Sequence, residues 1–257
     1  MQTRETGQAS QRGLRLLPTR ILALAAFALL LSACGGAPLG PPQVVIGDFD
    51  GDGKDDIAIV QGEQAALDLD RDGTLDTTRP FHLPGSRILA GDFDGDGQDD
   101  LAARRGSTLR ADLDADGHPD FERRYGLETD TLLVGDWTGD GKANLAVRRG
   151  DTLLFDTDGE GPHDRELVFG NASEAVLVGD WNGDNRDNVA VRRGDRLLID
   201  LDFQPGHDSE RRFGTPGDAL LVGDWDGDGK ADLATQEGDT IRIGEQVLRY
   251  EELGAKR

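Results

Sequence analysis

Residues 47–59 read GDFDGDGKDDIAI, and related stretches begin at residues 91, 135, 179 and 223. Each stretch begins with Gly-Asp-aromatic, and successive copies are 44 residues apart without slippage. Self-similarity with a fixed period of about 20 to 50 residues indicates a repeat architecture, in which every copy is one structural unit. The sequence therefore predicts five tandem units of one kind.

The third copy shows what such a unit contains. Four short segments, 131–135, 145–148, 152–155 and 165–169, are separated by turns and loops that contain Gly or Asp. Segments this short are typical of strands joined by hairpins, whereas a helix needs about ten residues. Four strands in about 40 to 45 residues are typical of a propeller blade. The sequence thus predicts an all-β fold, a β-propeller of five four-stranded blades over residues 43–254.

The loop after the first strand of each copy carries oxygen-bearing side chains at fixed positions. In the first copy Asp48, Asp50, Asp52 and Asp56 occupy positions 1, 3, 5 and 9, with Gly53 at position 6. Calcium needs about six to eight oxygen ligands, and carboxylates on alternate residues of a tight loop converge on one point. Glycine at position 6 permits the sharp left-handed turn that lets the carbonyl of position 7 face an ion. The spacing matches the first nine positions of a calcium loop, while the small octahedron of magnesium fits less well.

All five copies keep this pattern. With position 7 contributing its backbone carbonyl, the candidate ligands are Asp48, Asp50, Asp52, Lys54 and Asp56; Asp92, Asp94, Asp96, Gln98 and Asp100; Asp136, Thr138, Asp140, Lys142 and Asn144; Asp180, Asn182, Asp184, Arg186 and Asn188; and Asp224, Asp226, Asp228, Lys230 and Asp232. Loops one, two and five offer four carboxylates, whereas loops three and four offer two, so we expect the latter two to bind calcium more weakly. In loop four Asn185 replaces the turn glycine, and asparagine tolerates the left-handed conformation better than most residues.

A second acidic loop lies between the third and fourth strands of a copy. The first two examples give the candidate ligands Asp68, Asp70, Asp72, Thr74 and Asp76, and Asp112, Asp114, Asp116, His118 and Asp120. We expect two more calcium sites here, besides about five in the main loops. The equivalent loops that begin at Asp156 and Asp200 are less regular, with Pro162 in one and Gln204 in the other, and the pattern leaves their occupancy open.

The stretch D-F-D-G-D-G-x-x-D-I-A after a short apolar strand resembles the FG-GAP/VCBS repeat family, which includes the calcium-binding blades of integrin α-subunits. The resemblance covers residues 43–251 and implies a propeller with calcium held between the first and second strands of each blade. This chain departs from the integrin pattern, because it has five short blades instead of seven longer ones and lacks most of the F-G…G-A-P portion. The resemblance does not indicate how the first and last blades are joined.

The N-terminal segment has the composition of an export signal. Arg12, Arg15 and Arg20 precede an apolar run at 21–31, and its last residue begins the sequence Leu-Ser-Ala-Cys at residues 31–34. A basic segment, a short apolar run and small residues before a cleavage point describe a secretory signal, and the last four residues resemble a bacterial lipobox. We therefore predict a lipoprotein signal peptide at residues 1–33, and a lipidated Cys34 with a flexible tether at residues 34–42. The expected location is the bacterial cell envelope, with the chain lipid-anchored at the outer membrane or cell surface.

Charge and residue types narrow the function. The net charge is −22, so nucleic acid is not an expected partner, because binding to phosphates needs a basic surface. No nucleophile with a nearby base is evident, and the only cysteine is Cys34, so we predict that the chain is not an enzyme. The expected function is a calcium-binding module that binds a protein or a glycan, with the ions stabilising the blades. A carbohydrate-active enzyme, such as a glycosidase or lyase, and a lectin remain the alternatives.

Overall fold

The structure, a computed structural model, describes residues 40–83 and 87–250. These residues form twenty strands, and none of them belongs to a helix that could cross a membrane. The predicted signal peptide, Cys34, the tether up to residue 39 and residues 251–254 of the predicted propeller lie outside the described residues.

The strands form five separate four-stranded sheets, and each sheet is one copy of the repeat. In blade order the strands are β1 (Gln43–Gly47), β2 (Asp56–Gln61), β3 (Gln64–Asp68) and β4 (Thr77–Pro80); β5 (Arg87–Gly91), β6 (Asp100–Arg105), β7 (Thr108–Asp112) and β8 (Phe121–Arg124); β9 (Thr131–Gly135), β10 (Asn144–Arg149), β11 (Thr152–Asp156) and β12 (Arg165–Val168); β13 (Ala175–Gly179), β14 (Asn188–Arg193), β15 (Arg196–Asp200) and β16 (Ser209–Arg212); and β17 (Ala219–Gly223), β18 (Asp232–Glu237), β19 (Thr240–Ile243) and β20 (Gln246–Arg249). The predicted five-bladed propeller of four-stranded blades is confirmed.

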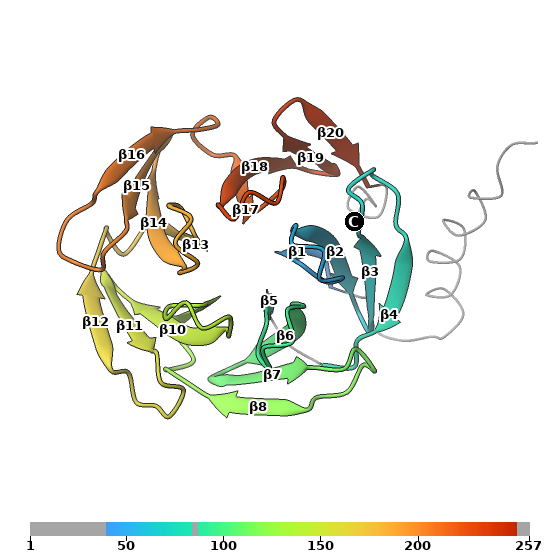
Figure 1. Cartoon of the computed structure of the whole chain (residues 1–257), viewed down its shortest axis with the longest axis horizontal. Helices are drawn as coiled ribbons and strands as arrows, with labels where there is room; N and C mark the ends of the chain where they lie inside the picture. The colour runs from blue at the N-terminus through green and yellow to red at the C-terminus, as the bar shows by residue number, and fades with distance from the viewer. Residues whose placement is uncertain (1–39, 84–86, 251–257) are drawn as a thin grey trace, which may run out of the picture. The chain divides into compact units, whose positions relative to one another are not determined.

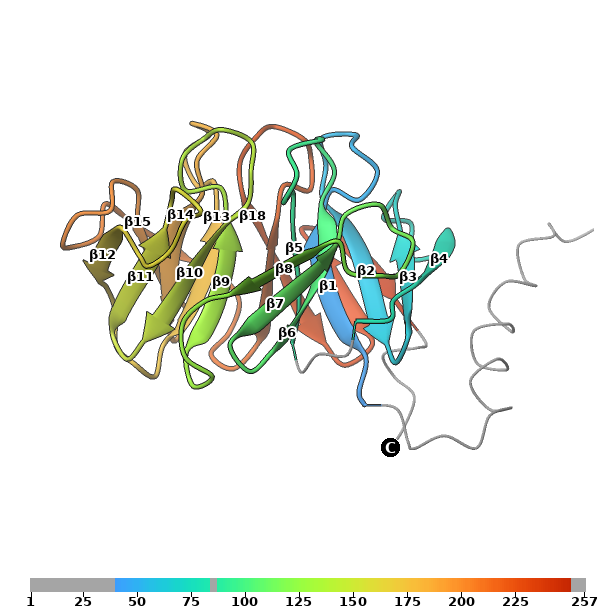
Figure 2. The ribbon, with the colours of Figure 1, turned by 90° about the horizontal axis from the view of Figure 1, so that it is seen from below.

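Every sheet is an antiparallel meander in which each strand pairs with the next one along the chain. The register repeats as well. Gly47, the last residue of β1, pairs with Asp56 of β2, and Gly179, the last residue of β13, pairs with Asn188 of β14. Because successive strands run in opposite directions, the main loop and the second acidic loop of a blade lie at the same end of its sheet. Figure 2 shows these loops projecting from one face of the ring.

The hydrophobic core consists of five clusters, and each lies between two neighbouring blades. The aromatic residue at position 2 of the main loop belongs to this core. Trp137, for example, packs with Phe155 of its own blade and with Val189 and Val191 of the next blade. Such side chains bury apolar surface between sheets that are each too thin to form a core alone. The position-2 aromatics therefore join the blades.

The blades surround a common axis, with β1, β5, β9, β13 and β17 innermost (Figure 1). The innermost strands of neighbouring blades contact each other around the whole ring, including β1 against β17. At this closing junction Ile57 and Ile59 of blade 1 share a cluster with Trp225 and Tyr250 of blade 5. The ring is thus closed by packing between its first and last blades, a point that the sequence left undecided.

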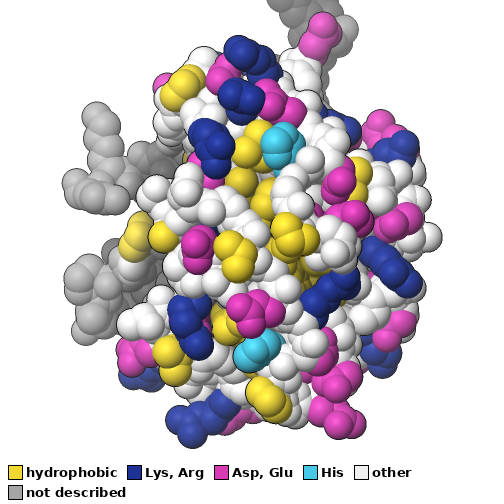
Figure 3. Space-filling view, turned by 90° about the vertical axis from the view of Figure 1, so that its left-hand side faces the viewer, with side chains coloured by type: hydrophobic (Ala, Val, Ile, Leu, Met, Phe, Trp, Pro, Cys, Tyr) yellow, Lys and Arg dark blue, Asp and Glu magenta, His cyan; other side chains and the backbone are white. Residues whose placement is uncertain are grey.

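The outer strands carry charges of both signs. On the side of the ring that bears β12 and β16, acidic and basic side chains are interspersed with apolar ones (Figure 3). Arg196 of β15 forms an ion pair with Glu210 of β16. The acidic excess of the chain is therefore concentrated in the loops rather than on the outer strands.

Candidate metal centre

The aspartate at position 1 gives each main loop its shape. Asp48 Oδ1 accepts hydrogen bonds from the N–H groups of Gly51, at 2.7 Å, and Asp52, at 3.1 Å, while Oδ2 accepts one from Gly53, at 2.8 Å. The same three bonds form in the other four loops, at Asp92, Asp136, Asp180 and Asp224. The aspartate at position 1 therefore holds the loop in shape by accepting hydrogen bonds from the loop backbone, whichever residues occupy the other candidate ligand positions.

Two left-handed residues complete the turn. The residue at position 6 has positive φ in every loop, 82° at Gly53 and 63° at Asn185, as expected from the sequence. Position 4 is also left-handed, with φ of 77° at Gly51, which the sequence analysis did not predict. Glycine adopts this conformation without steric cost, which explains why position 4 is glycine in all five copies.

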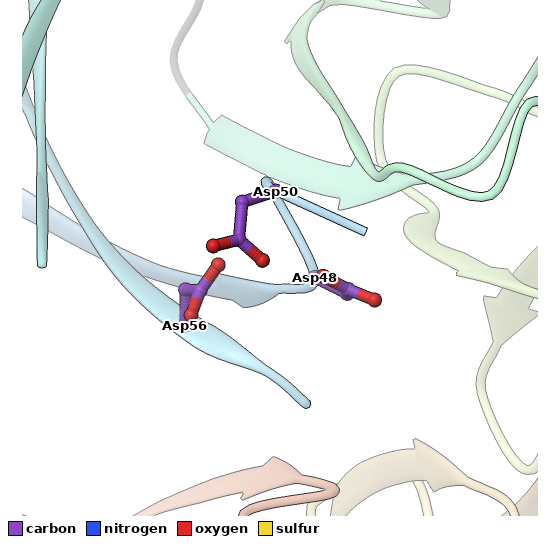
Figure 4. Close-up of side chains that lie close together, drawn as sticks. All are labelled: Asp48, Asp50 and Asp56. Carbon is purple, nitrogen blue, oxygen red and sulfur yellow. The ribbon is translucent and has the colours of Figure 1, made fainter. Parts of the chain in front are cut away.

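The remaining ligand positions gather their oxygens at one point. At position 3, Asp50 Oδ1 accepts the N–H of Asp52, and at position 5, Asp52 Oδ1 accepts the N–H of Lys54, so the second oxygen of each carboxylate has no backbone bond. Figure 4 shows the carboxylates of Asp50 and Asp56 turned toward each other, with Asp48 beside them. One oxygen from each of these three carboxylates lies within 4.8 Å of the others. Calcium–oxygen bonds are about 2.3–2.6 Å long, so oxygens this close can share one ion.

The same closeness holds for Asp92, Asp94 and Asp96 in the second main loop. It also holds in the second acidic loops, for the sets Asp68, Asp70 and Asp76; Asp112, Asp114 and Asp120; and Asp156, Asp158 and Asp164. The last set belongs to a loop whose occupancy the sequence left open. All of these donors are carboxylate oxygens, which suit a hard cation such as calcium.

Position 9 is the most buried ligand position. Asp56 and Asp100 are both buried, and burial raises the pKa of each to about 7. A hydrogen bond from one backbone N–H of the loop lowers each pKa, but by less than burial raises it. Nearby carboxylates, Asp50 for Asp56 and Asp94 for Asp100, raise both pKa values further. Burial also raises the pKa of Asp232 in loop five. Without a cation these loops hold negative charge where solvation is poor.

Loops three and four have an amide at position 9 instead. The Oδ1 atoms of Asn144 and Asn188 are buried, and no donor among the described residues reaches them. Buried oxygens are normally hydrogen-bonded, and an unsatisfied one costs about 1–3 kcal/mol. An oxygen ligand aimed at a cation needs no donor, so these two atoms fit the expected metal site.

Position 3 differs between the two kinds of loop. In loop three the Thr138 hydroxyl donates to Asp136 Oδ1 at 3.2 Å, and in loop four the Asn182 amide donates to Asp184 Oδ2 at 3.1 Å. In loops three and four the position 3 side chain therefore donates a hydrogen bond to a loop aspartate. The Asp50 carboxylate at position 3 of loop one has no hydrogen to donate.

The side chains at position 7 lie across the preceding blade. A β-carbon on Gly95 would meet Lys142, one on Gly139 would meet Arg186, and one on Gly183 would meet Lys230. Lys142 Nζ donates to the carbonyl of Asp94 at 2.7 Å. Only glycine leaves room for this crossing, so position 4 is fixed by packing between blades as well as by its backbone angle. The side chains of Lys54 and Gln98 cross Gly227 and Gly51 in the same way.

An arginine from the second acidic loop of blade 1 reaches the main loop of the same blade. Arg71 Nη1 donates to Asp56 Oδ1 at 2.8 Å and to the carbonyl of Asp55 at 2.9 Å. The equivalent residue in blade 2 is Ala115, which has the same left-handed backbone but no charge. The Arg71 guanidinium thus contacts one oxygen of a candidate ligand in blade 1, whereas Ala115 brings no such charge to Asp100 in blade 2.

The second acidic loops begin with a buried aspartate. Asp68 Oδ2 accepts a hydrogen bond from the Tyr250 hydroxyl at 2.6 Å, across the junction that closes the ring. Burial raises the pKa of Asp68 and of Asp112. Thr74 and His118, at position 7, each donate a backbone N–H to the aspartate at position 5, Asp72 or Asp116.

Position 8 has a role that the sequence analysis missed. Its N–H donates to the position 1 carbonyl of the preceding blade at all five junctions, from Asp55 to Asp224 at 2.9 Å and from Asp99 to Asp48 at 2.6 Å, for example. Where position 8 is aspartate, its carboxylate also accepts the N–H of that position 1 residue, as Asp187 does from Asp136 at 2.8 Å. These residues are 44 positions apart, so aligning the five copies would have shown that position 8 is either aspartate or alanine.

Three of these aspartates line a cavity of about 420 Å³ on the propeller axis, together with Val134, Val178 and Val222. Asp55, Asp99 and Asp187 keep some exposed surface inside the cavity, but protein surrounds them. Burial raises the pKa of Asp55 to about 6 and of Asp187 to about 7, and it raises that of Asp99 well above its usual range. The other two blades have Ala143 and Ala231 in this position, so the ring of charge at the axis is asymmetric.

No family model matches the chain, and no curated protein matches it. Among solved structures, the Photorhabdus luminescens Tc holotoxin pore is similar at a TM-score of 0.45 and 20% identity, covering 84% of this chain. The chain spans only 11% of the length of that toxin chain.

Two other solved structures are similar to the chain. An Agrocybe aegerita lectin described as recognising non-reducing terminal N-acetylglucosamine has a TM-score of 0.47 and 13% identity, covering 78% of this chain and 76% of its own. The V. cholerae biofilm matrix protein Bap1 has a TM-score of 0.33 and 18% identity, covering 71% of this chain and 30% of its own. These likenesses concern the fold.

Proposed function

We propose that the chain is a calcium-binding propeller of the cell envelope that acts as an interaction module for a protein or a glycan. The observation that carries the calcium assignment is the set of five main loops with one shared backbone geometry, two of which bring oxygens of three carboxylates within 4.8 Å of one another. The buried Asn144 Oδ1 and Asn188 Oδ1 support it, because these oxygens lack any donor among the described residues. The resemblance of the loop sequences to FG-GAP/VCBS repeats supports the same assignment.

The ions would act on the structure of the blades. Each main loop connects the first and second strands of a blade, and its position 1 residue bonds the next blade through position 8. A cation in the loop would therefore hold two strands together beside a junction between blades. It would also reduce the repulsion among carboxylates that burial has left poorly solvated. The propeller would then be stabilised by free calcium through mass action.

The charge of the chain fits this role. Removal of residues 1–33, which carry four Arg and one Glu, changes the net charge from −22 to −25. Five divalent ions would bring it to about −15. The remaining negative charge would keep the module soluble and select against polyanionic partners.

The location rests on the sequence around Cys34. Export and lipidation would hold the module at the membrane by its N-terminus, with the tether to residue 42 allowing the loop-bearing face to reach a partner. Labelling with a palmitate analogue tests this step: the wild-type chain would carry label in its bacterial host, and Cys34→Ser would not. Label retained in Cys34→Ser would contradict the anchor.

Native mass spectrometry of the purified chain, with calcium and after EDTA, tests the metal assignment. We expect five or more bound calcium ions that EDTA removes. A chain that binds no calcium while keeping its compact charge states would show that the loops are solvated turns, and the proposed function would fail.

A further inference from the structure

The second acidic loop of blade 4 contains a buried oxygen without a partner. Asp200, the last residue of β15, is 1% exposed. Its Oδ1 atom accepts the N–H of Phe203 at 2.6 Å. Its Oδ2 atom is buried, and no donor among residues 40–83 and 87–250 reaches it.

The equivalent carboxylates of blades 1 to 3 all have a partner at Oδ2, and blade 5 has a shortened loop without this aspartate. Asp68 accepts from the Tyr250 hydroxyl at 2.6 Å, Asp112 accepts the N–H of Gly117 at 2.9 Å, and Asp156 forms an ion pair with Arg123 Nη2 at 3.6 Å. The unsatisfied oxygen of Asp200 is therefore not a general property of this loop in the repeat.

The lost donors can be traced in the loop itself and in the neighbouring blade. In blades 1 to 3 the N–H of position 6, at Gly73, Gly117 or Gly161, donates to this carboxylate, whereas blade 4 has Pro205 there, which has no N–H. The tyrosine and the arginine that serve Asp68 and Asp156 come from the end of the preceding blade. In blade 3 the repeat places Phe169 at the tyrosine position and Leu167 at the arginine position, and both side chains are buried. Neither can donate a hydrogen bond. An isolated buried carboxylate is strongly unfavourable, so this one needs either a proton or a cation.

We infer that the loop from Asp200 to Asp208 binds a divalent cation of the calcium type, with Asp200 Oδ2 as its buried ligand. Asp202 Oδ1 accepts the N–H of Gln204, and Asp208 Oδ2 accepts that of Leu201, which leaves Asp202 Oδ2 and Asp208 Oδ1 available. These three aspartates occupy the same loop positions as Asp68, Asp70 and Asp76, whose oxygens lie within 4.8 Å of one another.

The donor set selects the ion. The three carboxylates offer only hard oxygen ligands, which suit calcium rather than zinc. Asp202 and Asp208 are exposed, so an ion can enter from solvent, while Asp200 forms the floor of the site. Arg165 of blade 3 reaches this loop, where its guanidinium carbon lies 4.5 Å from the centre of the Phe203 ring.

The inference rests on the proposed calcium binding, and the experiment separates the two. Native mass spectrometry would count calcium ions on the wild-type chain, Asp202→Asn, Asp200→Asn and Asp195→Asn. Asp195 lies in the β14–β15 turn at the opposite end of blade 4 and pairs with Arg212 at 3.2 Å, so its variant removes one charge without changing either acidic loop of the blade. At a calcium concentration that saturates the wild type, we expect one ion fewer on Asp202→Asn and Asp200→Asn, and an unchanged count on Asp195→Asn.

The exposed position of Asp202 makes its variant decisive even if Asp200→Asn fails to fold. If the wild type binds calcium that EDTA removes while Asp202→Asn keeps the full wild-type count, the inference is overturned and the proposed function stands. That result would mean that Asp200 is held by a proton. If the wild type binds no calcium, both are overturned.

Discussion

The main loops of blades 1, 2 and 5 have the same backbone as those of blades 3 and 4, but a different chemistry. In both groups the aspartate at position 1 accepts three backbone N–H bonds, and position 6 has positive φ. The first group places carboxylates at positions 3 and 9, whereas the second has Thr138 or Asn182 at position 3 and an asparagine at position 9.

This difference separates the requirements for folding the loop from those for binding an ion. The aspartate at position 1 and the left-handed residues at positions 4 and 6 occur in all five copies, which share the loop geometry. The carboxylate loops hold buried charge at Asp56 and Asp100, whose pKa values rise to about 7 mainly because of burial. The amide loops have no such charge and leave a neutral oxygen without a donor. A cation should therefore contribute more to the carboxylate loops than to the amide loops.

Calcium removal should have the largest effect. An ion at a free concentration of 100 times its dissociation constant adds about 2.7 kcal/mol to stability, and about 1 kcal/mol shifts the Tm of a domain of this size by about 2–4 °C. The loss of five ions should lower the Tm by about 20 °C or more, measured by circular dichroism with 1 mM calcium and then with EDTA. Magnesium at the same concentration is the control and should restore little of the loss. An identical melt in EDTA would contradict a structural role for the ions.

Exchange of the position 9 residues between the two groups should give opposite results. Asp100→Asn removes one buried carboxylate from loop two, so calcium affinity there should fall about tenfold, equivalent to about 1.4 kcal/mol. In EDTA the same variant should melt higher than the wild type, because the buried charge is gone. Asn188→Asp should do the reverse in loop four. Isothermal titration calorimetry and melting curves measure the two effects, and a variant that shifts both in the same direction would contradict the comparison.

The fold was predictable because the repeat period carried the information. Period, strand length and turn residues together determined five blades of four strands, and Gly47, Gly91 and their equivalents marked the end of each first strand. The places of the candidate ligand side chains in each loop followed from the same register. The aromatics at position 2, from Phe49 to Trp225, lie in the core between blades, with Phe93 only partly buried.

The missed features all involve contacts between different copies or loops. Asp55 and Asp99 each bond the preceding blade and line the axial cavity. Arg71 reaches Asp56, a candidate ligand in another loop. Tyr250 closes the ring through Asp68, 182 residues away along the chain. Such contacts depend on how blades are placed beside each other, and a pattern within one copy does not contain that information.

The pH dependence of the calcium-free chain should also separate the two groups. The pKa of Asp56 and Asp100 is about 7 in the folded chain, above the ordinary aspartate value of 3.8 expected when unfolded. A raised pKa means that the folded state binds the proton more tightly, so this contribution to stability is present at low pH and is lost as pH rises through about 7. In EDTA the Tm should therefore increase as pH falls from 8 to 6. Asp100→Asn should show a smaller increase, and a Tm that falls over this range would contradict the assignment.

The smallest expected effect concerns Arg71, which distinguishes blade 1 from blade 2 within the carboxylate group. Its guanidinium holds Asp56 Oδ1 at 2.8 Å, and its side chain is only 12% exposed, so an ion in loop one must share this oxygen with a positive charge. Arg71→Ala reproduces the residue found at Ala115 in blade 2. The variant should bind calcium in loop one about fivefold more tightly, equivalent to about 1 kcal/mol, but should melt lower in EDTA because the buried Asp56 loses its partner. Calcium titration of the wild type, Arg71→Ala and Ala115→Arg measures these affinities directly. Ala115→Arg should weaken calcium binding in loop two. Equal affinities in all three chains would show that Arg71 serves the fold of blade 1 alone.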